Sequence, residues 1–585
     1  MKKTKIVCTI GPASEERSVF KQLVENGLNV ARLNFSHGSH EEHLGRIDMI
    51  KSVREELGAP VAIMLDTKGP EIRTGKFSVP VVTLVEGQTF TLTTEEFLGT
   101  QDKCQISYEG LPGDVVIGDK ILIDDGLIEL EVKAIKGKEI ETLVLNAGDV
   151  KNNKGVNVPG VKIQLPAITA KDESDIIFGI QNGIDFIAAS FIRKAGDVLE
   201  IRKILEAHNG EDVHIISKIE NQEGVDNLDE ILTVSDGLMV ARGDLGVEIP
   251  TEMVPLTQKE MIRKCNLEGK PVITATQMLD SMMRNPRPTR AETTDVANAI
   301  FDGTDAIMLS GETAAGRYPV ESVKTMAVIA QTTEGSLDYT SILKEKAQSI
   351  REKGVTFAVS HATCTTANDL EAAAILTATA SGFTARKVAK FRPKAPIIAS
   401  CTNEKVRRKI NLVWGVFPIV AEEANNTDDI FHNSVELSKS EGYIQAGDLI
   451  IFTAGVPVGV AGATNLMKVE LVGENIIKGI GLGKELVKGR ACVVKSAADC
   501  AEKFKEGDIL VTQATDIDMM DYIEKASGLV VEEGGYTSHA AIVALNLKLP
   551  AIIGAKSVTE CIKDGESLTL DADKGLLYVG ATRVL

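Results

Sequence analysis

One pattern recurs eight times along this chain and constrains its fold more than any other feature. It is a short apolar run that ends abruptly in polar residues. Segments with helix-like spacing of apolar residues, such as 18–27 and 196–210, separate most of these runs. Continuous apolar strands that alternate with helices are typical of a parallel sheet covered on both faces. The runs are KIVCTIGPAS (5–14), NVARLNFSHG (29–38), VAIMLDTKGP (61–70), DFIAASFIRK (185–194), HIISKIEN (214–221), GLMVARGDLG (237–246), PVITATQMLD (271–280) and AIMLSGETA (306–314).

Eight such strands favour an α/β fold with a closed (β/α)8 TIM barrel over an open doubly wound sheet, which would not require eight equivalent strand ends. After the third strand the alternation stops, and short β-branched strands follow one another between Gly and Asp turns. We therefore expect a barrel from 1–69 and 168–340, with an all-β insertion at 70–167. Residues 341–472 alternate between strand-like and helix-like segments, which predicts a separate α/β domain.

Composition excludes several classes of protein. The net charge of −19 argues against general binding to nucleic acid or to anionic membranes. No apolar run reaches the roughly 18 residues of a membrane span. The eight cysteines are scattered without a CxxC pair, which is typical of a reducing compartment. The expected protein is cytoplasmic, with neither nucleic acid nor membrane as partner.

Several strand ends carry charged or hydroxyl side chains on one face. Lys218 and Glu220 are two residues apart, so a strand directs both to the same side, where a simple ion pair is the alternative to catalysis. In a barrel these groups would meet at one rim, where cations and carboxylates together suit a metal ion and a polyanion. The other members of the set are Arg32, Asn34 and Ser36 (alternatively a half-exposed strand), Asp66 and Thr67, Arg73, Asp244 and Thr276.

These strand ends closely resemble the motifs of the pyruvate kinase family, and the resemblance runs across roughly residues 1–472. It implies transfer of a phosphoryl group from phosphoenolpyruvate to ADP, which gives pyruvate and ATP in the last step of glycolysis. It also identifies 70–167 as a mobile lid and 341–472 as an effector-binding domain. The matching segments are ARLNFSHG (31–38), LDTKGPEIRTG (65–75), NKGVNVPG (153–160), SKIENQEGVDN (217–227), MVARGDLGVEIP (239–250), ATQMLDSM (275–282) and NPRPTRAE (285–292).

The resemblance implies a role for each rim residue. Glu220 and Asp244 would hold Mg²⁺ (or Mn²⁺), and the backbone amides of Gly243 and Asp244 would receive the substrate carboxylate, with Gly243 allowing close approach. Lys218 would neutralise the phosphoryl group in transfer, and Arg32 would bind it. Thr276 would contact the substrate and take part in protonating the enolate, with a water behind it. Arg73, Lys154 and His37 would bind the nucleotide.

The same comparison assigns a K⁺ ion to Asn34, Ser36, Asp66 and Thr67. Members of the family that do not need K⁺ have a lysine in place of the glutamate of GPEIRTG. This chain keeps Glu71, so we expect K⁺ dependence. The alternative for Glu71 is a salt bridge at the hinge of the lid.

The segment TATASGFTA (377–385) predicts a loop between a strand and a basic helix. Small polar residues at a helix N-terminus can bind phosphate, although a solvated helix cap is an equal alternative from the residues alone. Members of the family bind phosphorylated effectors at this place. The resemblance therefore assigns Thr379, Ser381, Gly382 and Thr384 to an allosteric effector whose identity the sequence does not reveal.

Residues 473–585 extend beyond the usual end of the family and contain EEGGYTSHAAIVALNLKLPAIIG. This segment resembles the mobile phosphohistidine domain of phosphoenolpyruvate-utilising enzymes, in which the acceptor histidine corresponds to His539. We recognise no ATP-grasp domain in the sequence that could act together with this histidine. We expect a retained, swivelling-type fold that serves packing or subunit contacts, with a regulatory role and true phosphohistidine chemistry as the alternatives.

Two rival functions remain open at the level of sequence. A Mg²⁺-dependent barrel lyase acting on pyruvate enolate would not need Arg73 and Lys154. A metabolite sensor that binds phosphoenolpyruvate without turnover would tolerate the loss of Lys218 or Thr276, and both are present. The resemblance further suggests a homotetramer.

Overall fold

The computed structural model describes residues 1–349, 354–422, 426–456, 463–472 and 477–579. The chain forms two compact units, and residues 473–476, where the expected C-terminal domain would begin, lie outside the described residues, as do 580–585. The first unit comprises Met1–Glu352, Ala380–Arg392 and Cys401–Val420, and the second comprises Lys353–Thr379, Pro393–Ser400 and Ala421–Leu585.

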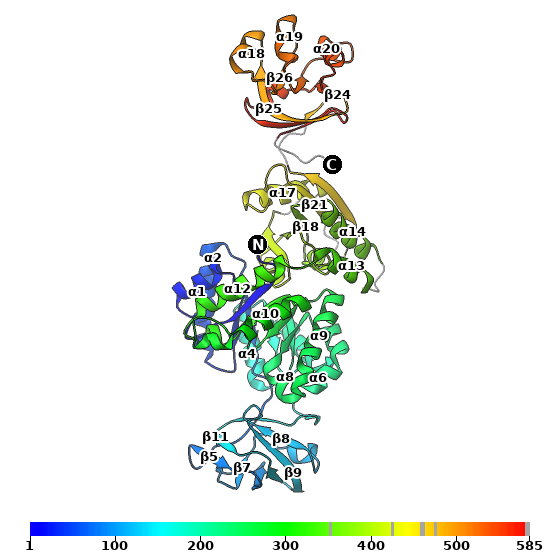
Figure 1. The fold of residues 1–585 in the computed structure, drawn as a ribbon. Helices are drawn as coiled ribbons and strands as arrows, with labels where there is room; N and C mark the ends of the chain where they lie inside the picture. The colour runs from blue at the N-terminus through cyan, green and yellow to red at the C-terminus, as the bar shows by residue number, and fades with distance from the viewer. Residues whose placement is uncertain (350–353, 423–425, 457–462, 473–476, 580–585) are drawn as a thin grey trace. The chain divides into compact units, whose positions relative to one another are not determined.

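A closed barrel of parallel strands forms the centre of the first unit, as the sequence predicts (Figure 1). The strand order is β1-β17-β16-β15-β14-β13-β3-β2, and pairing of β1 with both β17 and β2 closes the ring. The eight strands coincide with the eight apolar runs. They are β1 (Lys5–Thr9), β2 (Val30–Asn34), β3 (Ala62–Asp66), β13 (Phe186–Ala189), β14 (His214–Ile219), β15 (Gly237–Ala241), β16 (Val272–Ala275) and β17 (Ala306–Leu309).

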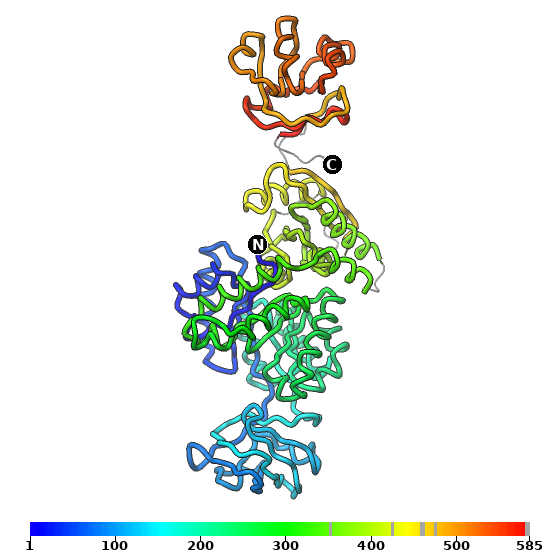
Figure 2. The backbone as a smooth tube through the Cα atoms, in the orientation of Figure 1, coloured from blue at the N-terminus to red at the C-terminus, as the bar shows by residue number. Residues whose placement is uncertain are grey.

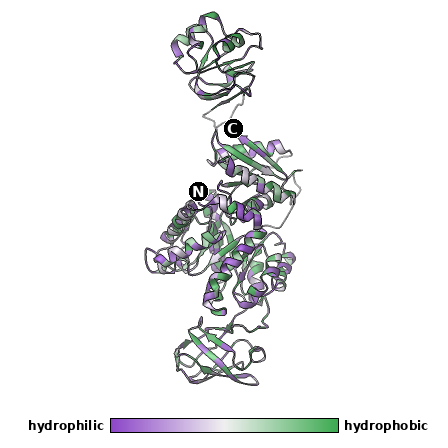
Figure 3. Cartoon of the chain, turned by 45° about the vertical axis from the view of Figure 1, so that its right-hand side comes forward, coloured by the Kyte–Doolittle hydropathy of each residue, from purple (hydrophilic) through white to green (hydrophobic). Residues whose placement is uncertain are grey.

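Local sequence signals set the bounds of several barrel helices. The capping boxes Ser39–Glu42, Thr169–Asp172 and Thr289–Glu292 begin α2, α4 and α10. In Figure 3 the barrel helices carry both purple and green residues, as expected where one face packs on a sheet and the other meets solvent. The helices are α1 (Arg17–Glu25), α2 (His40–Leu57), α4 (Ala170–Gln181), α5 (Ala195–Ala207), α6 (Gln222–Asp226), α7 (Leu228–Val234), α8 (Arg242–Glu248), α9 (Val254–Glu268), α10 (Arg290–Asp302), α11 (Gly311–Ala314), α12 (Pro319–Gly335) and α13 (Tyr339–Ser349), with 3-10 turns at Thr251–Met253 and Asp280–Met283.

The barrel interior is a packed apolar core rather than a channel. Side chains from all eight strands, including Val7, Met64 and Met239, form one buried cluster. Leu412 joins this cluster from the distant segment 401–420 and is fully buried there. Burying a leucine side chain stabilises a fold by roughly 1.5–3 kcal/mol, so this single contact helps to fix the segment on the barrel.

The insertion after β3 is all-β apart from one short helix, α3 (Leu111–Asp114), and Figure 2 follows the backbone into this lid and back to α4. One sheet has the order β4-β12-β8-β9-β10-β6-β7, and β11 pairs with β5. Alternating buried residues such as Ile128, Leu130 and Val132 supply its own core. The strands are β4 (Ile72–Arg73), β5 (Val81–Leu84), β6 (Thr89–Thr93), β7 (Lys103–Gln105), β8 (Lys120–Ile123), β9 (Ile128–Lys136), β10 (Glu139–Val144), β11 (Gly148–Lys151) and β12 (Gly155–Asn157).

The expected α/β segment contributes to both units. In the second unit β19, β18, β21 and β22 are neighbours in that order, with β22 antiparallel to β21. The first unit contains α15 (Phe383–Ala389), α16 (Glu404–Ile410) and β20 (Val416–Val420). The other elements are α14 (Val355–Asp369), β18 (Ala374–Ala378), β19 (Ile397–Cys401), α17 (Thr427–Ser440), β21 (Leu449–Ala454) and β22 (Leu466–Leu471).

The C-terminal residues form an eight-stranded sheet with the order β23-β30-β29-β25-β26-β27-β28-β24. Helices α18, α19 and α20 lie on one side of it (Figure 1). The elements are β23 (Ile477–Lys478), β24 (Ile480–Leu482), β25 (Leu486–Val494), α18 (Ala497–Lys503), β26 (Ile509–Thr512), α19 (Met520–Ile523), β27 (Gly528–Val531), α20 (His539–Leu547), β28 (Ala551–Ile553), α21 (Val558–Cys561), β29 (Ser567–Asp571) and β30 (Leu576–Val579), with a 3-10 turn at Ile517–Met519.

Among the helices in the described part of the chain, none is both long and apolar enough to cross a bilayer.

Candidate active site

Strands β2, β3 and β14, of which only β2 and β3 are adjacent, bring Arg32, Asp66 and Lys218 together at the C-terminal rim of the barrel. The Asp66 carboxylate accepts a hydrogen bond from Arg32 Nε at 2.5 Å and another from Lys218 Nζ at 3.2 Å. All three side chains are buried. Burial alone would raise the pKa of Asp66, but the two cations outweigh it and lower that pKa below its ordinary value. Asp66 is therefore an anion that holds both cations in place.

Lys218 also contacts Glu220, so the ion pair considered from the sequence is present. Lys218 Nζ lies 2.9 Å from Glu220 Oε1, and the backbone N–H of Phe191 donates to Glu220 Oε2 at 2.6 Å. Burial raises the pKa of Glu220 to about 7, with Lys218 opposing the shift and the negative charge of Asp244 adding to it. Burial lowers the pKa of Lys218, but Asp66 and Glu220 outweigh that effect and raise it above its ordinary value. A carboxylate buried this deeply favours a nearby cation.

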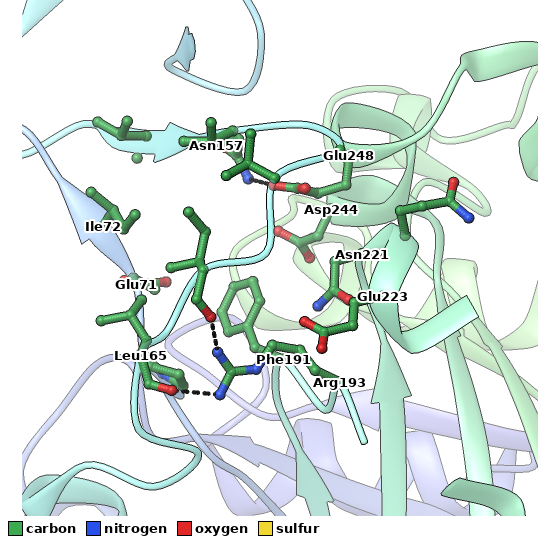
Figure 4. Close-up of a pocket in the computed structure, with 18 of the residues that line it drawn as sticks. Glu71, Ile72, Asn157, Leu165, Phe191, Arg193, Asn221, Glu223, Asp244 and Glu248 are labelled. Atoms are coloured by element: carbon green, nitrogen blue, oxygen red, sulfur yellow. Dashed lines mark hydrogen bonds between the residues drawn. The ribbon is translucent and has the colours of Figure 1, made fainter. Parts of the chain in front are cut away.

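Gly243 and Asp244 follow β15 without an intervening loop, because Arg242 begins α8 directly. The sequence interpretation treats them as a strand end, and the structure places them in the first helical turn. Asp244 lines a pocket together with Asn221, Glu223 and Glu248 (Figure 4). Among the described residues, no three His, Cys, Asp or Glu side chains group closely enough to hold a metal by themselves. Mg²⁺ commonly takes only one or two protein carboxylates, which a pair such as Glu220 and Asp244 can supply.

Thr276 occupies an unusual turn after β16. Its φ is +67° and that of Gln277 is +53°, a region that non-glycine residues seldom adopt. The Thr276 hydroxyl donates to the carbonyl of Ala275 at 2.7 Å and accepts the Gly243 N–H at 2.8 Å. A Cβ added to Gly243 would lie 3.6 Å from Thr276 Oγ1, an ordinary contact, so protein packing alone does not require glycine there.

Arg242 holds this turn in place. Its guanidinium donates to the carbonyl oxygens of Ala275 and Thr276 at 3.1 and 2.8 Å, and it pairs with Asp295 of α10 at 2.7 Å. Sequence reasoning recognised Arg242 at the strand end but assigned it no role. Its support of Thr276 becomes apparent only in the structure, where β15 and β16 are neighbours.

The four residues assigned to K⁺ lie on adjacent strand ends. Asn34 and Asp66 are register partners on β2 and β3, and Thr67 follows Asp66 directly. The Asn34 side-chain oxygen accepts the Ser36 N–H at 3.1 Å, while Thr67 Oγ1 accepts the Ser190 N–H at 3.0 Å. Asp66 thus belongs both to this set and to the cluster that it forms with Arg32 and Lys218.

The lid side of the rim bounds a cavity of about 340 Å³. Arg73 and Lys154 both line it, as expected for residues that meet a polyanion. Lys154 pairs with Asp124 at 2.8 Å, and Arg73 donates to Glu71 at 2.7 Å. Glu71 therefore makes the lid-hinge salt bridge that the sequence offered as the alternative to a role in K⁺ dependence. In Figure 4, Glu71 and Ile72 face Asn221 and Glu223 across this pocket.

His37 is exposed and is not part of the pocket lining, so the structure does not bring it together with Arg73 and Lys154. Its carbonyl accepts a hydrogen bond from His43 Nε2 at 2.8 Å, and the His43 ring stacks on Phe35 with 3.9 Å between centroids. Phe35 lies between Asn34 and Ser36. His43 therefore holds the loop after β2 through its contacts with His37 and Phe35.

Three of the expected effector residues, Thr379, Ser381 and Gly382, lie between β18 and α15, and the fourth, Thr384, lies in α15. Gly382 has φ of +80°, and a Cβ there would clash with Ile410 of α16, so both backbone conformation and packing require glycine. Ser381 is exposed, whereas Thr384 is buried in α15, and Thr379 is buried at the end of β18.

His539 begins α20. Ser538 caps this helix by accepting the Ala541 N–H at 3.2 Å, which confirms the helix start considered from the sequence. His539 Nδ1 is hydrogen-bonded to Thr515 Oγ1 at 2.8 Å.

Three family models match the chain, and they fall on its successive parts. The model described as pyruvate kinase, barrel domain, matches residues 1–323, more than half of the chain. The model described as pyruvate kinase, alpha/beta domain, matches 357–470. The chain belongs to the pyruvate kinase family. The third model, described as PEP-utilising enzyme, mobile domain, matches 504–575.

Curated relatives in this family match the chain from end to end. Pyruvate kinases from Sporosarcina psychrophila and Geobacillus stearothermophilus are each 56% identical to it, and that of Bacillus licheniformis is 54% identical. Each alignment covers 100% of both chains. The crystal structure of a pyruvate kinase from Cryptosporidium parvum is 42% identical, with a TM-score of 0.77, and the match covers 80% of this chain and 96% of that one.

These comparisons confirm the family, the barrel architecture and the extra C-terminal domain predicted from the motifs. The chain is therefore an enzyme of the phosphotransferase class. Its family generally requires a divalent metal and potassium, and the family name implies phosphoenolpyruvate and ADP as substrates.

Proposed function

We propose that this chain transfers the phosphoryl group of phosphoenolpyruvate to ADP, giving pyruvate and ATP, at the C-terminal rim of its barrel. The observation that carries this proposal is the buried cluster in which Lys218 lies between Asp66 and Glu220. An ammonium held between two anions is fixed in position and remains protonated, as stabilisation of charge on a transferring phosphoryl group requires.

Glu220 and Asp244 are the proposed ligands of Mg²⁺ (or Mn²⁺). Carboxylate oxygens are the ligands that this ion prefers. Burial raises the pKa of Glu220 and the negative charge of Asp244 adds to that shift, so a cation between the two carboxylates would stabilise both as anions. When bound, the ion would offset negative charge on the substrate. The backbone amides of Gly243 and Asp244 would receive the substrate carboxylate, for which the Gly243 N–H would have to leave Thr276.

The remaining rim residues act on the substrate directly. Arg32 would bind the phosphoryl group while Asp66 holds its guanidinium from behind. Thr276, kept in its strained turn by Arg242, would contact the substrate and pass a proton to the enolate through a water, because a hydroxyl alone is a weak acid.

The nucleotide would bind in the cavity on the lid side, with Arg73 and Lys154 on its phosphates. His37 would have to reach the nucleotide from outside this cavity. Asn34, Ser36, Asp66 and Thr67 would coordinate K⁺, since neutral oxygens with a single carboxylate suit a weakly charged ion.

We also propose a homotetrameric, cytoplasmic enzyme with domains at 1–69 and 168–340, 70–167, 341–472 and 473–585. A phosphorylated effector would bind at Thr379, Ser381, Gly382 and Thr384. These proposals are supported by membership of the family and by the loop conformation at Gly382.

One assay distinguishes the proposal from its rivals. Pyruvate release from phosphoenolpyruvate is followed with Mg²⁺ and K⁺ present, with and without ADP. Release that requires ADP supports the kinase. ADP-independent release would indicate a lyase, and binding without release under either condition would indicate a sensor.

A further inference from the structure

The turn that follows β13, Ser190 and Phe191, contacts both Lys218 and Glu220. Ser190 Oγ accepts a hydrogen bond from Lys218 Nζ at 2.8 Å, and the Phe191 N–H donates to Glu220 Oε2 at 2.6 Å. No role was assigned to either residue from the sequence, although DFIAASFIRK was recognised as one of the eight strand ends. Two consecutive residues thus reach the two groups on which the proposed chemistry depends.

The backbone of this turn is held in an unfavourable conformation. Phe191 has φ of +54°, a genuine outlier for a bulky side chain. Such conformations persist where the surroundings fix them, and they cluster at functional sites. Here the conformation directs the Phe191 N–H at Glu220, while the ring lines the pocket (Figure 4).

Contacts with the residues that follow β3 fix the turn from the other side. The Ser190 hydroxyl donates to the Thr67 carbonyl at 2.6 Å, and the Ser190 N–H donates to Thr67 Oγ1 at 3.0 Å. Gly69 has φ of +71°, and a Cβ there would lie 2.8 Å from the Phe191 ring and 2.9 Å from Ser190 Cβ. The small residue at 69 is therefore what allows the turn to approach the rim.

The Lys218 ammonium has three N–H donors and three partners. These are Ser190 Oγ, Asp66 Oδ1 at 3.2 Å and Glu220 Oε1 at 2.9 Å. Without the Ser190 hydroxyl only the two carboxylates remain, so the ammonium would bind Glu220 more firmly. A divalent ion that needs the same carboxylate would then compete with it.

We propose that Ser190 and the Phe191 amide form a positioning element that keeps the Lys218 ammonium and the Glu220 carboxylate available for the phosphoryl group and the metal ion, respectively. This inference rests on the proposed function, because it gives those roles to Lys218 and Glu220. Ser190 accepts one of the ammonium's hydrogen bonds, and the Phe191 amide orients one carboxylate oxygen. Neither residue needs to touch the substrate.

The test compares Ser190→Ala with the wild-type full-length protein and with Ser217→Ala. Ser217 is an equally buried serine on β14 whose hydroxyl bonds Ser235 at 2.7 Å, so it controls for the loss of any buried hydroxyl. The first readout is Mn²⁺ binding without substrates, measured by electron paramagnetic resonance. The second readout is steady-state kinetics, which show whether the substitution changes kcat, the KM for phosphoenolpyruvate, or both.

For Ser190→Ala we expect Mn²⁺ to bind about 10-fold more weakly and kcat to fall about 10–100-fold, the usual range for a group that supports a metal ligand. Ser217→Ala should leave both within about twofold, and Ser190→Thr, which keeps the hydroxyl, should recover most of the loss. The proposal is overturned if Ser190→Ala retains normal Mn²⁺ affinity and kcat, if Ser217→Ala matches its losses, or if Ser190→Thr recovers neither.

If Ser190→Ala does not fold, Gly69→Ala takes its place, because its methyl would displace the same turn without removing any side chain that contacts Lys218 or Glu220. Weaker Mn²⁺ binding by a folded Gly69→Ala supports the proposal, and unchanged binding contradicts it. Mn²⁺ binding is measured without turnover. A wild type that fails to make ATP would therefore reject the proposed function and leave this positioning test standing.

Discussion

Arg408 donates its Nε–H to Asp185 over 2.8 Å and so joins helix α16 to the residue that precedes strand β13. The second oxygen of Asp185 accepts the Ile63 N–H of β3 at 2.9 Å. Burial raises the pKa of Asp185, while Arg408 opposes that shift. The same helix ends at Ile410, against which Gly382 packs closely. A single short helix therefore contacts both the expected effector loop and the N-terminal side of the barrel.

The first prediction concerns this loop. A phosphorylated sugar or nucleotide should lower the apparent KM for phosphoenolpyruvate, because it binds one of two conformations more tightly. Replacing Ser381 and Thr384 together by Ala should weaken that activation and leave turnover without effector nearly intact. Initial rates across a range of effector concentrations check this. An unchanged activation curve in the double variant would place the effector elsewhere.

The second prediction is that Lys218→Met lowers kcat by roughly 10²–10³-fold, the cost of removing one charge-stabilising group, with less effect on KM for phosphoenolpyruvate. Lys270→Met is a matched control, since Lys270 donates to the carbonyl of Leu232, outside the rim. Steady-state kinetics of both variants provide the measurement. Near-normal kcat in Lys218→Met would contradict the assignment.

The third prediction concerns K⁺. With Mg²⁺ saturating and only Na⁺ or a large organic cation present, activity should fall sharply, because the oxygens of Asn34, Ser36, Asp66 and Thr67 would lack their ion. Glu71→Lys should relieve much of this dependence by placing an ammonium near the site, although it also removes the salt bridge with Arg73. Rates measured against KCl concentration test both statements. Full wild-type activity without K⁺ would refute them.

The fourth prediction is a pH dependence of stability that arises at Lys5. Its Nζ donates to the Val416 carbonyl at 2.5 Å in a fully buried position, and burial, aided by the positive charge of Lys2, lowers its pKa to about 7. An exposed lysine has a pKa of about 10.4, so between these values the unfolded chain binds more protons at this residue. The free energy of unfolding should therefore rise with pH, by at most about 1.4 kcal/mol per pH unit.

Denaturation midpoints of the wild type and of Lys5→Met, measured between pH 7 and pH 9.5, check this prediction. The difference between the two proteins should shift in favour of the wild type as pH rises, because Met carries no proton to lose. Parallel pH curves would show that Lys5 does not titrate in this window.

The last prediction is that His539 takes no part in the kinase reaction. His539→Ala should be kinetically silent, and truncation after residue 472 should keep most of kcat, because transfer at the rim needs no covalent carrier. Incubation with labelled phosphoenolpyruvate and Mg²⁺, without ADP, tests this directly. Acid-labile label that disappears in His539→Ala would contradict this prediction and show that His539 carries phosphate.

The sequence by itself determined the fold class and the family. The eight apolar runs became the eight barrel strands because each is a continuous local signal, readable without knowing its neighbours in space. The all-β insertion was recognised in the same way, from β-branched strands and turns at a position where a helix was expected. Rim residues such as Lys218 and Asp244 were identified because they directly follow or end such runs, and the resemblance to family motifs implied the roles that are proposed for them.

The tertiary structure decided what surrounds those residues. Ser190 reaches Lys218, Arg242 reaches Thr276, and Leu412 enters the barrel only because strands or segments far apart in sequence are neighbours in the closed barrel. The left-handed turn at Phe191 has no local signal either, since nothing in SFIR favours it. Local patterns report the periodicity of one element. Which side chains meet, and how burial then shifts their charges, depends on packing that no single segment contains.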